Sequence, residues 1–323
     1  MLSPTVRILN FDNSLLKQKN LLQKFHPTIV DLKEWGPEAR IWLPEKAAAA
    51  IRSHLNPQLK NSITFLGSGD FHQVTSLLLE QFDGPLTVIV FDHHPDWDIL
   101  PPRLHCGSWV TEALRRKNIK KMILLGVSSS DLSTFSIQSG NLASLKASRV
   151  EIYPYVHPPT KVFLREVPPN PSVRIEKRIL SRKIEWEELQ KKNLREFFLA
   201  LVRRLETRQV YVSIDKDCLK ERFALTNWEE GCFALDELLL LLSLILEHLE
   251  VVGLDIVGDY SEARVKGLVK RALARWDRPV NFTAKGQSEE WISNVNEETN
   301  LKLVETLRRT LLASPVEPKQ SPG

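Results

Sequence analysis

Acidic and histidine side chains gather where one strongly apolar run of the sequence ends. Asp92, His94 and Asp96 follow the run Leu86–Phe91, and alternate residues of an extended segment project to the same side. Pro95 favours an extended conformation for His94 and so helps to hold that projection. Three potential ligands at the end of a buried strand are costly unless a cation compensates their charge. The alternative, an acidic turn with a solvated histidine, is disfavoured by the apolar character of the preceding run.

Two further runs end in the same way. Asp215 and Asp217 share one face at the end of Gln209–Ile214, and His72 follows the glycine-containing turn after Ser62–Leu66. Alone, the first is also typical of a polar turn, and the second of a structural histidine near a helix start. Together the three sites supply four carboxylates and two imidazoles, which suit a hard or borderline ion such as Mn²⁺. Six ligands exceed the needs of one ion, and a two-metal site can share bridging carboxylates.

The remaining sequence predicts the elements that position these residues. Apolar runs of strand length alternate with helical patterns, which favours a mostly parallel sheet with helices on both faces. In such sheets ligands bind beyond the carboxyl ends of the strands. The runs cover residues 6–11, 28–32, 62–66, 86–91, 121–126, 150–155, 209–214 and 251–257, and the helical patterns cover 15–25, 45–55, 71–81, 107–116, 194–205, 234–249 and 289–312. We expect a single domain over residues 1–312, a long surface loop over 157–171 and a disordered tail over 313–323.

Composition narrows the classes of function. The chain has 323 residues, of which 42% are hydrophobic and 26% charged, with a formal net charge of +4. The basic residues are scattered and do not alternate with aromatic ones, so we do not expect a nucleic-acid partner. The longest apolar run, Leu238–Leu246, is too short to cross a bilayer, and the N-terminal residues do not resemble a signal peptide. The sequence therefore predicts a soluble cytoplasmic protein without a membrane partner, and its Cys106, Cys218 and Cys232 are expected to be reduced.

The order of the candidate ligands resembles the metal signature of the ureohydrolase superfamily, which includes arginase and agmatinase. The matching segments are GSGDFH ending at His72, DHHPD at 92–96, SIDKD at 213–217, TNWEEG at 226–231 and GLDIV at 253–257, so the resemblance covers about residues 62–262. It implies a three-layer α/β/α fold with a central, mostly parallel sheet and two Mn²⁺ ions. It also implies two ligand sets that share Asp92 and Asp215: His72, Asp92, Asp96 and Asp215 for one ion, and His94, Asp92, Asp215 and Asp217 for the other.

The longer segments are similar to those of one branch, the peptide arginases. These segments are FLGSGDFH, VIVFDHHPDWD, CGSWV and VYVSIDKDCLK. The resemblance implies that arginine side chains of a ribosomally made peptide are converted to ornithine with release of urea. A metal-bridging hydroxide would attack the guanidinium carbon. His105 or Asp96 would then protonate the departing amine.

The sequence departs from the pattern for free guanidines at one strand end. Family members acting on guanidines have a Glu after the strand that here ends at Val257, whereas this chain has Gly258. Asp259 is the nearest carboxylate that could pair with a guanidinium, and Glu262 lies a little further on. The alternative is that Asp259 is a loop or helix-capping residue.

The loop after Asp96 also departs from the pattern for free arginine, because it is short and apolar. A substrate whose α-amine and α-carboxylate are tied up in peptide bonds would not need the polar contacts that such a loop provides. Trp97 or Trp109 would offer a contact surface for it, the alternative being that both rings simply pack in the core.

Three other functions remain open from the sequence alone. A small-molecule ureohydrolase acting on arginine or agmatine has the same ligand set. Zinc deacylases share the broad fold, but they have a leaner ligand set for a single ion. A non-catalytic homologue that binds metal and peptide is the third alternative, because the guanidinium Glu is absent at Gly258. The resemblance also leaves a homo-oligomer open.

Overall fold

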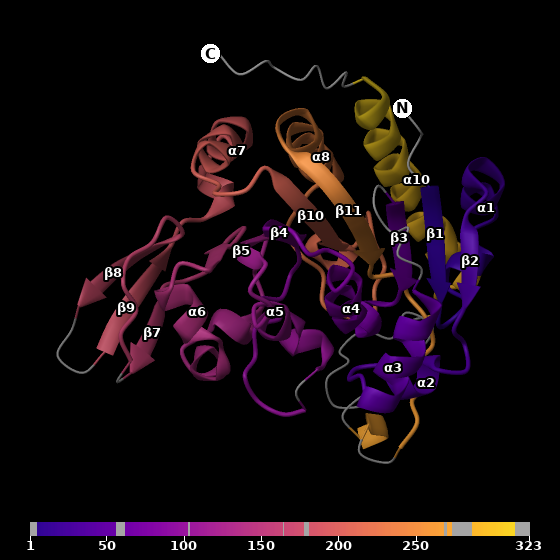
Figure 1. Cartoon of the computed structure of the whole chain (residues 1–323), viewed down its shortest axis with the longest axis horizontal. Coiled ribbons are helices and arrows are strands. Elements are labelled where there is room, and N and C mark those ends of the chain that lie inside the picture. Colours follow the sequence, from indigo (N-terminus) through magenta and orange to yellow (C-terminus); the bar gives the residue numbers. More distant parts are fainter. Residues whose placement is uncertain are drawn as a thin grey trace.

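An eight-stranded sheet forms the centre of the molecule (Figure 1). The computed structural model describes residues 5–55, 62–102, 104–163, 165–177, 181–267, 270–272 and 286–313. All neighbouring strands of this sheet are parallel, in the order β2-β1-β3-β11-β10-β4-β5-β6. The strands are β1 (Thr5–Asn10), β2 (Thr28–Asp31), β3 (Ser62–Gly67), β4 (Leu86–Phe91), β5 (Ile119–Leu125), β6 (Val150–Tyr153), β10 (Gln209–Asp215) and β11 (Glu250–Val257).

The central strands are buried on both faces, as their continuous apolar sequences predict. In β4, Val88 and Val90 belong to one hydrophobic cluster, whereas Ile89 and Phe91 belong to another. Successive side chains of a strand point to opposite faces, so each face of the sheet has its own core.

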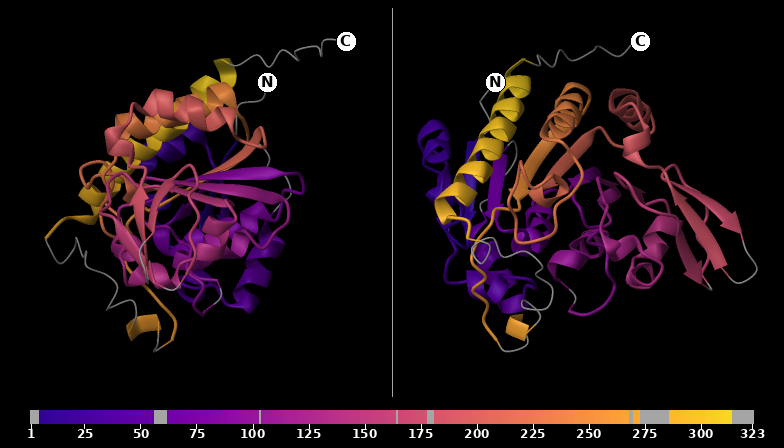
Figure 2. Two further views of the ribbon diagram at one scale, coloured as in Figure 1. Left: turned by 90° about the vertical axis from the view of Figure 1, so that its left-hand side faces the viewer. Right: turned by 180° about the vertical axis from the view of Figure 1, so that it is seen from behind.

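Helices cover both of these faces and complete three layers. One face packs against α1 (Lys19–Phe25), α7 (Leu194–Arg203), α8 (Leu235–His248) and α10 (Glu289–Ala313). The other packs against α2 (Gly36–Ala39), α3 (Glu45–His54), α4 (Thr75–Leu79), α5 (Trp109–Ala113) and α6 (Leu142–Lys146). The left-hand view of Figure 2 shows the two groups on opposite sides of the sheet. The predicted three-layer α/β/α fold with a parallel sheet is confirmed.

A second, smaller sheet corrects the expectation of a long surface loop at 157–171. It is antiparallel, in the order β7-β9-β8, and consists of β7 (Thr160–Phe163), β8 (Val173–Lys177) and β9 (Ser181–Trp186). In Figure 1 it lies at the left of the molecule, beside α6. These strands bury few residues, such as Val162 and Ile184, and most of their other positions are charged or polar. That sparse apolar signal, among several prolines, is typical of a loop in the sequence.

Two predictions about the whole chain are not tested by the structure. Residues 314–323 of the expected C-terminal tail lie outside the described residues, and a single domain over 1–312 stays a prediction. None of the described helices combines the length and the apolar character that crossing a bilayer would take.

Candidate metal centre

Three neighbouring strand ends bring the predicted ligands together. β3 leads into the short helix η2 (Gly69–Val74), β4 leads into the segment after Phe91, and β10 leads into η7 (Lys216–Cys218). β10 lies directly beside β4, and only β11 separates β10 from β3. Because parallel strands end at the same edge of a sheet, all six side chains meet there. They are His72 after β3; Asp92, His94 and Asp96 after β4; and Asp215 and Asp217 at the end of β10.

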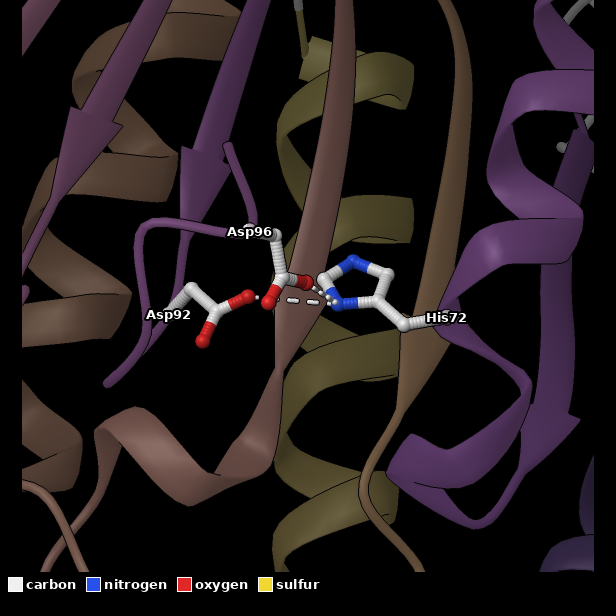
Figure 3. Close-up of side chains that lie close together, drawn as sticks. All are labelled: His72, Asp92 and Asp96. Atoms are coloured by element: carbon white, nitrogen blue, oxygen red, sulfur yellow. Dashed lines mark ion pairs between the residues drawn. The ribbon is translucent and has the colours of Figure 1, made fainter. Parts of the chain in front are cut away.

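The first group of candidate ligands surrounds the Nδ1 atom of His72. This nitrogen lies 3.2 Å from Oδ2 of Asp92, 3.1 Å from Oδ2 of Asp96 and 3.5 Å from Oδ2 of Asp215. All four side chains are buried. Figure 3 shows the Asp92 and Asp96 carboxylates turned towards the imidazole of His72. His72, Asp92 and Asp96 are close enough to hold one metal ion.

The second group contains Asp92, His94 and Asp217. Nδ1 of His94 lies 3.0 Å from Oδ2 of Asp217 and 3.7 Å from Oδ1 of Asp92. Asp92 therefore belongs to both groups, as a carboxylate bridging two ions would. Asp215 lies beside the first group, and its Oδ1 accepts a hydrogen bond of 3.1 Å from the backbone N–H of Asp217.

Hydrogen bonds on the far sides of both imidazoles favour metal-binding tautomers. Ser213 donates from Oγ to Asp255, so it accepts from Nε2–H of His72 at 2.9 Å. In the same way, Nε2 of His94 lies 3.3 Å from Glu229. If each Nε2 carries the proton, each Nδ1 presents a lone pair towards carboxylates, which is repulsive unless a cation lies between them. Nδ1 of His72 and Oδ2 of Asp92 are also buried without a hydrogen-bond partner.

The charges of the buried carboxylates also favour a bound cation. Burial and the neighbouring charge of Asp92 raise the pKa of Asp96 to about 7. Burial and the charges of Asp217 and Asp92 raise the pKa of Asp215 well above its usual range. Like charges buried together disfavour ionisation unless positive charge compensates them. The donor set and its electrostatics therefore fit divalent cations that prefer oxygen and imidazole ligands.

The surrounding residues hold Asp96 in a fixed orientation. Trp109 donates a hydrogen bond from Nε1 to Oδ2 of Asp96 at 2.7 Å, and its ring is fully buried beside His72. Asp96 has a φ of 45°, in the left-handed region that aspartate adopts more readily than most residues. Trp109 therefore packs in the core, the alternative to a role in substrate contact, and it also supports a candidate ligand.

The structure leaves little room for a side chain at Gly258. Its φ is 93°, and a Cβ atom there would lie 2.5 Å from Oδ1 of Asp215 and 2.8 Å from the backbone N of Lys216. A side chain would therefore collide with a candidate ligand in a backbone conformation that already favours glycine. The end of β11 cannot carry a carboxylate at residue 258 without moving the end of β10.

The structure does not bring Asp259 and Glu262 together with the candidate ligands. Asp259 is buried, forms an ion pair of 2.9 Å with Nζ of Lys216, and accepts a hydrogen bond of 2.6 Å from Gln18. Glu262 is exposed and pairs with Arg264. Both residues line a small separate cavity. Their role in substrate binding stays a prediction without support from their positions.

An open cavity of about 630 Å³ lies above the candidate ligands. It is lined by Asp92, His94, Asp96, Asp215 and Asp217, and also by His105 and Trp97. Burial lowers the pKa of His105, which favours a neutral imidazole at pH 7. Trp97 also lines the cavity but is only 1% exposed, so its side chain belongs mainly to the core. The predicted roles of these two residues stay predictions.

Glu229 lines the same cavity, although its residue type and position in the sequence did not single it out. Its side chain is half-exposed, and the hydrogen bond with His94 lowers the pKa of Glu229 to about 2. Asp98 and Asp131 also line the cavity, so its rim is acidic. The sequence signal was the segment TNWEEG, but its distance along the chain from His94 concealed their contact.

The sequence was compared with those of known proteins. No model of a known protein family matches the chain. A protein of Thermotoga maritima described as uncharacterized is 25% identical over 265 residues, which cover 80% of this chain and 81% of that protein.

The chain is also similar to several solved structures. Formimidoylglutamase from Bacillus subtilis matches with a TM-score of 0.55 and 14% identity, covering 98% of this chain and 89% of that one. Arginase from Entamoeba histolytica matches with a TM-score of 0.55 and 10% identity, covering 95% and 98%. Arginase from Bacillus caldovelox matches with a TM-score of 0.54 and 13% identity, covering 98% and 100%. The chain therefore has the arginase-like α/β fold, and its sheet edge carries candidate metal-binding residues.

Proposed function

We propose that this protein is a metal-dependent hydrolase that acts on a guanidinium group and releases urea. The observation that carries the proposal is the pair of ligand groups sharing Asp92 at the floor of an open, acidic cavity. His72, Asp92, Asp96 and Asp215 would hold one ion, and His94, Asp92, Asp215 and Asp217 the other. The carboxylate-rich set suits Mn²⁺. Two such ions supply a nucleophilic water at neutral pH.

The chain's own side chains have separable tasks in this reaction. Glu229, at the rim and ionised, would pair with the guanidinium in place of the absent family Glu. His105, neutral and facing the cavity, would receive a proton and deliver it to the departing amine. Asp96, whose pKa is raised to about 7, is the second candidate for that proton transfer.

We further propose that the guanidinium belongs to an arginine residue within a peptide, which would become ornithine. None of the described residues that line the cavity is a lysine or an arginine. The α-carboxylate of free arginine would therefore meet Asp98, Asp131 and Glu229 without a lysine or arginine side chain to receive it. An arginine in a peptide has no such charge. Agmatine also lacks the carboxylate, so the same observation supports a small-molecule ureohydrolase acting on agmatine as the second candidate.

A urea assay on the Mn²⁺-loaded protein tests both levels of the proposal. The compounds are N-acetyl-arginine methylamide, an arginine-containing peptide, free arginine and agmatine. We expect urea from the first two, with a matching loss of mass in the peptide. Urea from agmatine alone would favour the second candidate.

The variants Asp92→Ala and Asp215→Ala are the controls for the metal centre. Each should lower the rate of urea release at least about a hundredfold, because each removes a carboxylate placed to bridge the ions. Urea release by these variants at the wild-type rate would refute the proposed hydrolase, as would the absence of urea from every compound with the wild-type protein.

A further inference from the structure

The cavity above the candidate ligands is the first of three neighbouring cavities. Ser128, Ser129 and Ser130 line both the first cavity and a second one of about 530 Å³. The second cavity in turn shares His157, Pro158 and Pro159 with a third of about 540 Å³. Since each cavity shares lining residues with the next, the three lie side by side in a row from the metal ligands to the antiparallel sheet β7-β9-β8. We call this row the lateral groove.

Hydrogen bonds to backbone carbonyl oxygens hold the wall of the lateral groove in place at both ends. The amides of Ser128 and Ser129 donate to the carbonyl oxygen of His93, at 3.0 and 3.1 Å, which ties the wall to the ligand segment. The hydroxyl of Thr160 in β7 donates to the carbonyl oxygen of Leu132 at 2.6 Å. A groove wall that is already ordered costs a ligand little conformational entropy to bind.

The middle of the lateral groove presents apolar side chains to solvent. Phe135 is 90% exposed, and it lines the second cavity together with Pro158 and Pro159. A single exposed aromatic is ordinary on a protein surface. Here it adjoins a groove that leads to a candidate active site, where a bound chain would cover it. Covering an aromatic ring of this kind is a common source of affinity in interfaces.

The two ends of the lateral groove differ in charge. The first cavity has the acidic residues Asp98, Asp131 and Glu229 and no described lysine or arginine. The third cavity is lined by both signs, and there Arg174 and Lys192 each pair with Glu187 at 2.7 Å. The groove therefore has one end that attracts a cation, an apolar middle and an electrically balanced far end.

We propose that the lateral groove binds an extended peptide segment on one side of the arginine that is processed. The inference rests on the proposed function, since the arginine side chain would enter the acidic first cavity. Neighbouring residues of the peptide would cross the Ser128–Ser130 wall and contact Phe135. A small guanidine would occupy only the first cavity, so the groove is the feature that distinguishes a peptide substrate from agmatine.

Kinetics on substrates of different length test the inference. The probes are N-acetyl-arginine methylamide and two blocked peptides, one extended by six residues before the arginine and one extended by six after it. A leucine stands at the second position of each extension. One of the two peptides should have a KM about tenfold lower than the single blocked residue. Equal KM values for all three compounds would overturn the groove and leave the hydrolase intact.

Phe135→Ala identifies the surface, with Trp291→Ala as the matched control. Trp291 is also an exposed aromatic, 43% accessible, and it lines none of the three cavities among the described residues. Phe135→Ala should raise the KM of the favoured peptide about fivefold or more and leave that of the single residue unchanged. Trp291→Ala should change neither KM. Equal effects of both variants would contradict the assignment.

A direct measurement of peptide binding tests the lateral groove even if the protein releases no urea. Fluorescence anisotropy of the labelled peptides measures their affinity for the wild-type protein and for both aromatic variants. Weaker binding to Phe135→Ala alone would support the lateral groove although the proposed hydrolase would be wrong. No binding of either peptide to the wild-type protein would overturn the groove.

Discussion

The ends of β10 and β11 lie side by side in the sheet, yet their acidic residues have opposite surroundings. Asp215 and Asp217, at the end of β10, line the open cavity beside the other candidate ligands. Asp259, just beyond β11, is sealed in a buried network with Lys216 and Gln18. Gly258 lies between β11 and Asp259, with a φ of 93°, in the region that favours glycine. A position just after a parallel strand is therefore not enough to make an acidic residue a candidate site residue.

Substitution of Gly258 tests this difference most severely. Gly258→Ala should lower the free energy of unfolding by more than about 3 kcal/mol, because it combines a strained φ with a collision at Asp215. Gly267→Ala is the control, since Gly267 also has a positive φ but nothing within 4 Å of its added Cβ. It should cost only about 1 kcal/mol. Chemical denaturation measures both, and equal losses would mean that the collision with the ligand is unimportant.

Asp259 should matter to folding and not to substrate. Asp259→Ala leaves Lys216, which is fully buried, without its ion-pair partner, and we expect a loss of about 3 kcal/mol in stability. The exposed Glu262→Ala is the control and should change stability by less than about 0.5 kcal/mol. If Asp259→Ala instead unfolded like the wild-type protein while the KM for a guanidine substrate rose, the sequence-based assignment to the guanidinium would be restored.

Ser213 is expected to control how well His72 binds metal. Ser213→Ala removes the hydrogen bond at Nε2 and should weaken Mn²⁺ binding between about tenfold and a hundredfold. Thr75→Val is the matched control, because Thr75 also donates to Asp255, at 3.1 Å, and its hydrogen bond does not involve His72. Isothermal titration of both variants with Mn²⁺ decides the point, and identical affinities would show that the imidazole needs no such support.

Glu229 lines the open cavity and, in contrast to Asp259, should matter to substrate binding and not to folding. Glu229→Gln removes a charge from the rim, and we expect about a tenfold higher KM for N-acetyl-arginine methylamide with unchanged stability. Steady-state urea release and thermal unfolding measure the two quantities. An unchanged KM would assign Glu229 to the orientation of His94 alone.

The six residues that the sequence singled out as candidate ligands do lie together at one edge of the sheet, and there is a physical reason why the pattern pointed to them. A β-branched or aromatic run followed directly by acidic and histidine residues, as at Asp92 and Asp215, is costly to bury without a cation, so the pattern strongly favours a metal site. The same local reasoning could not predict the surroundings of Asp259, because its contacts with Lys216 and Gln18 join residues that are far apart in the sequence. It also missed Glu229, whose contact with His94 depends on the packing of two distant loops. The small sheet escaped prediction because its short strands have few apolar residues and the segment contains several prolines.

The number of metal ions bound per chain tests the central claim most directly. Equilibrium dialysis against Mn²⁺ followed by elemental analysis should give two ions per wild-type chain and about one for His94→Ala, which alters only the second group. Asp92→Ala should retain less than one ion, because both groups share that carboxylate. A single ion in the wild-type protein, or two ions retained by Asp92→Ala, would contradict the shared centre.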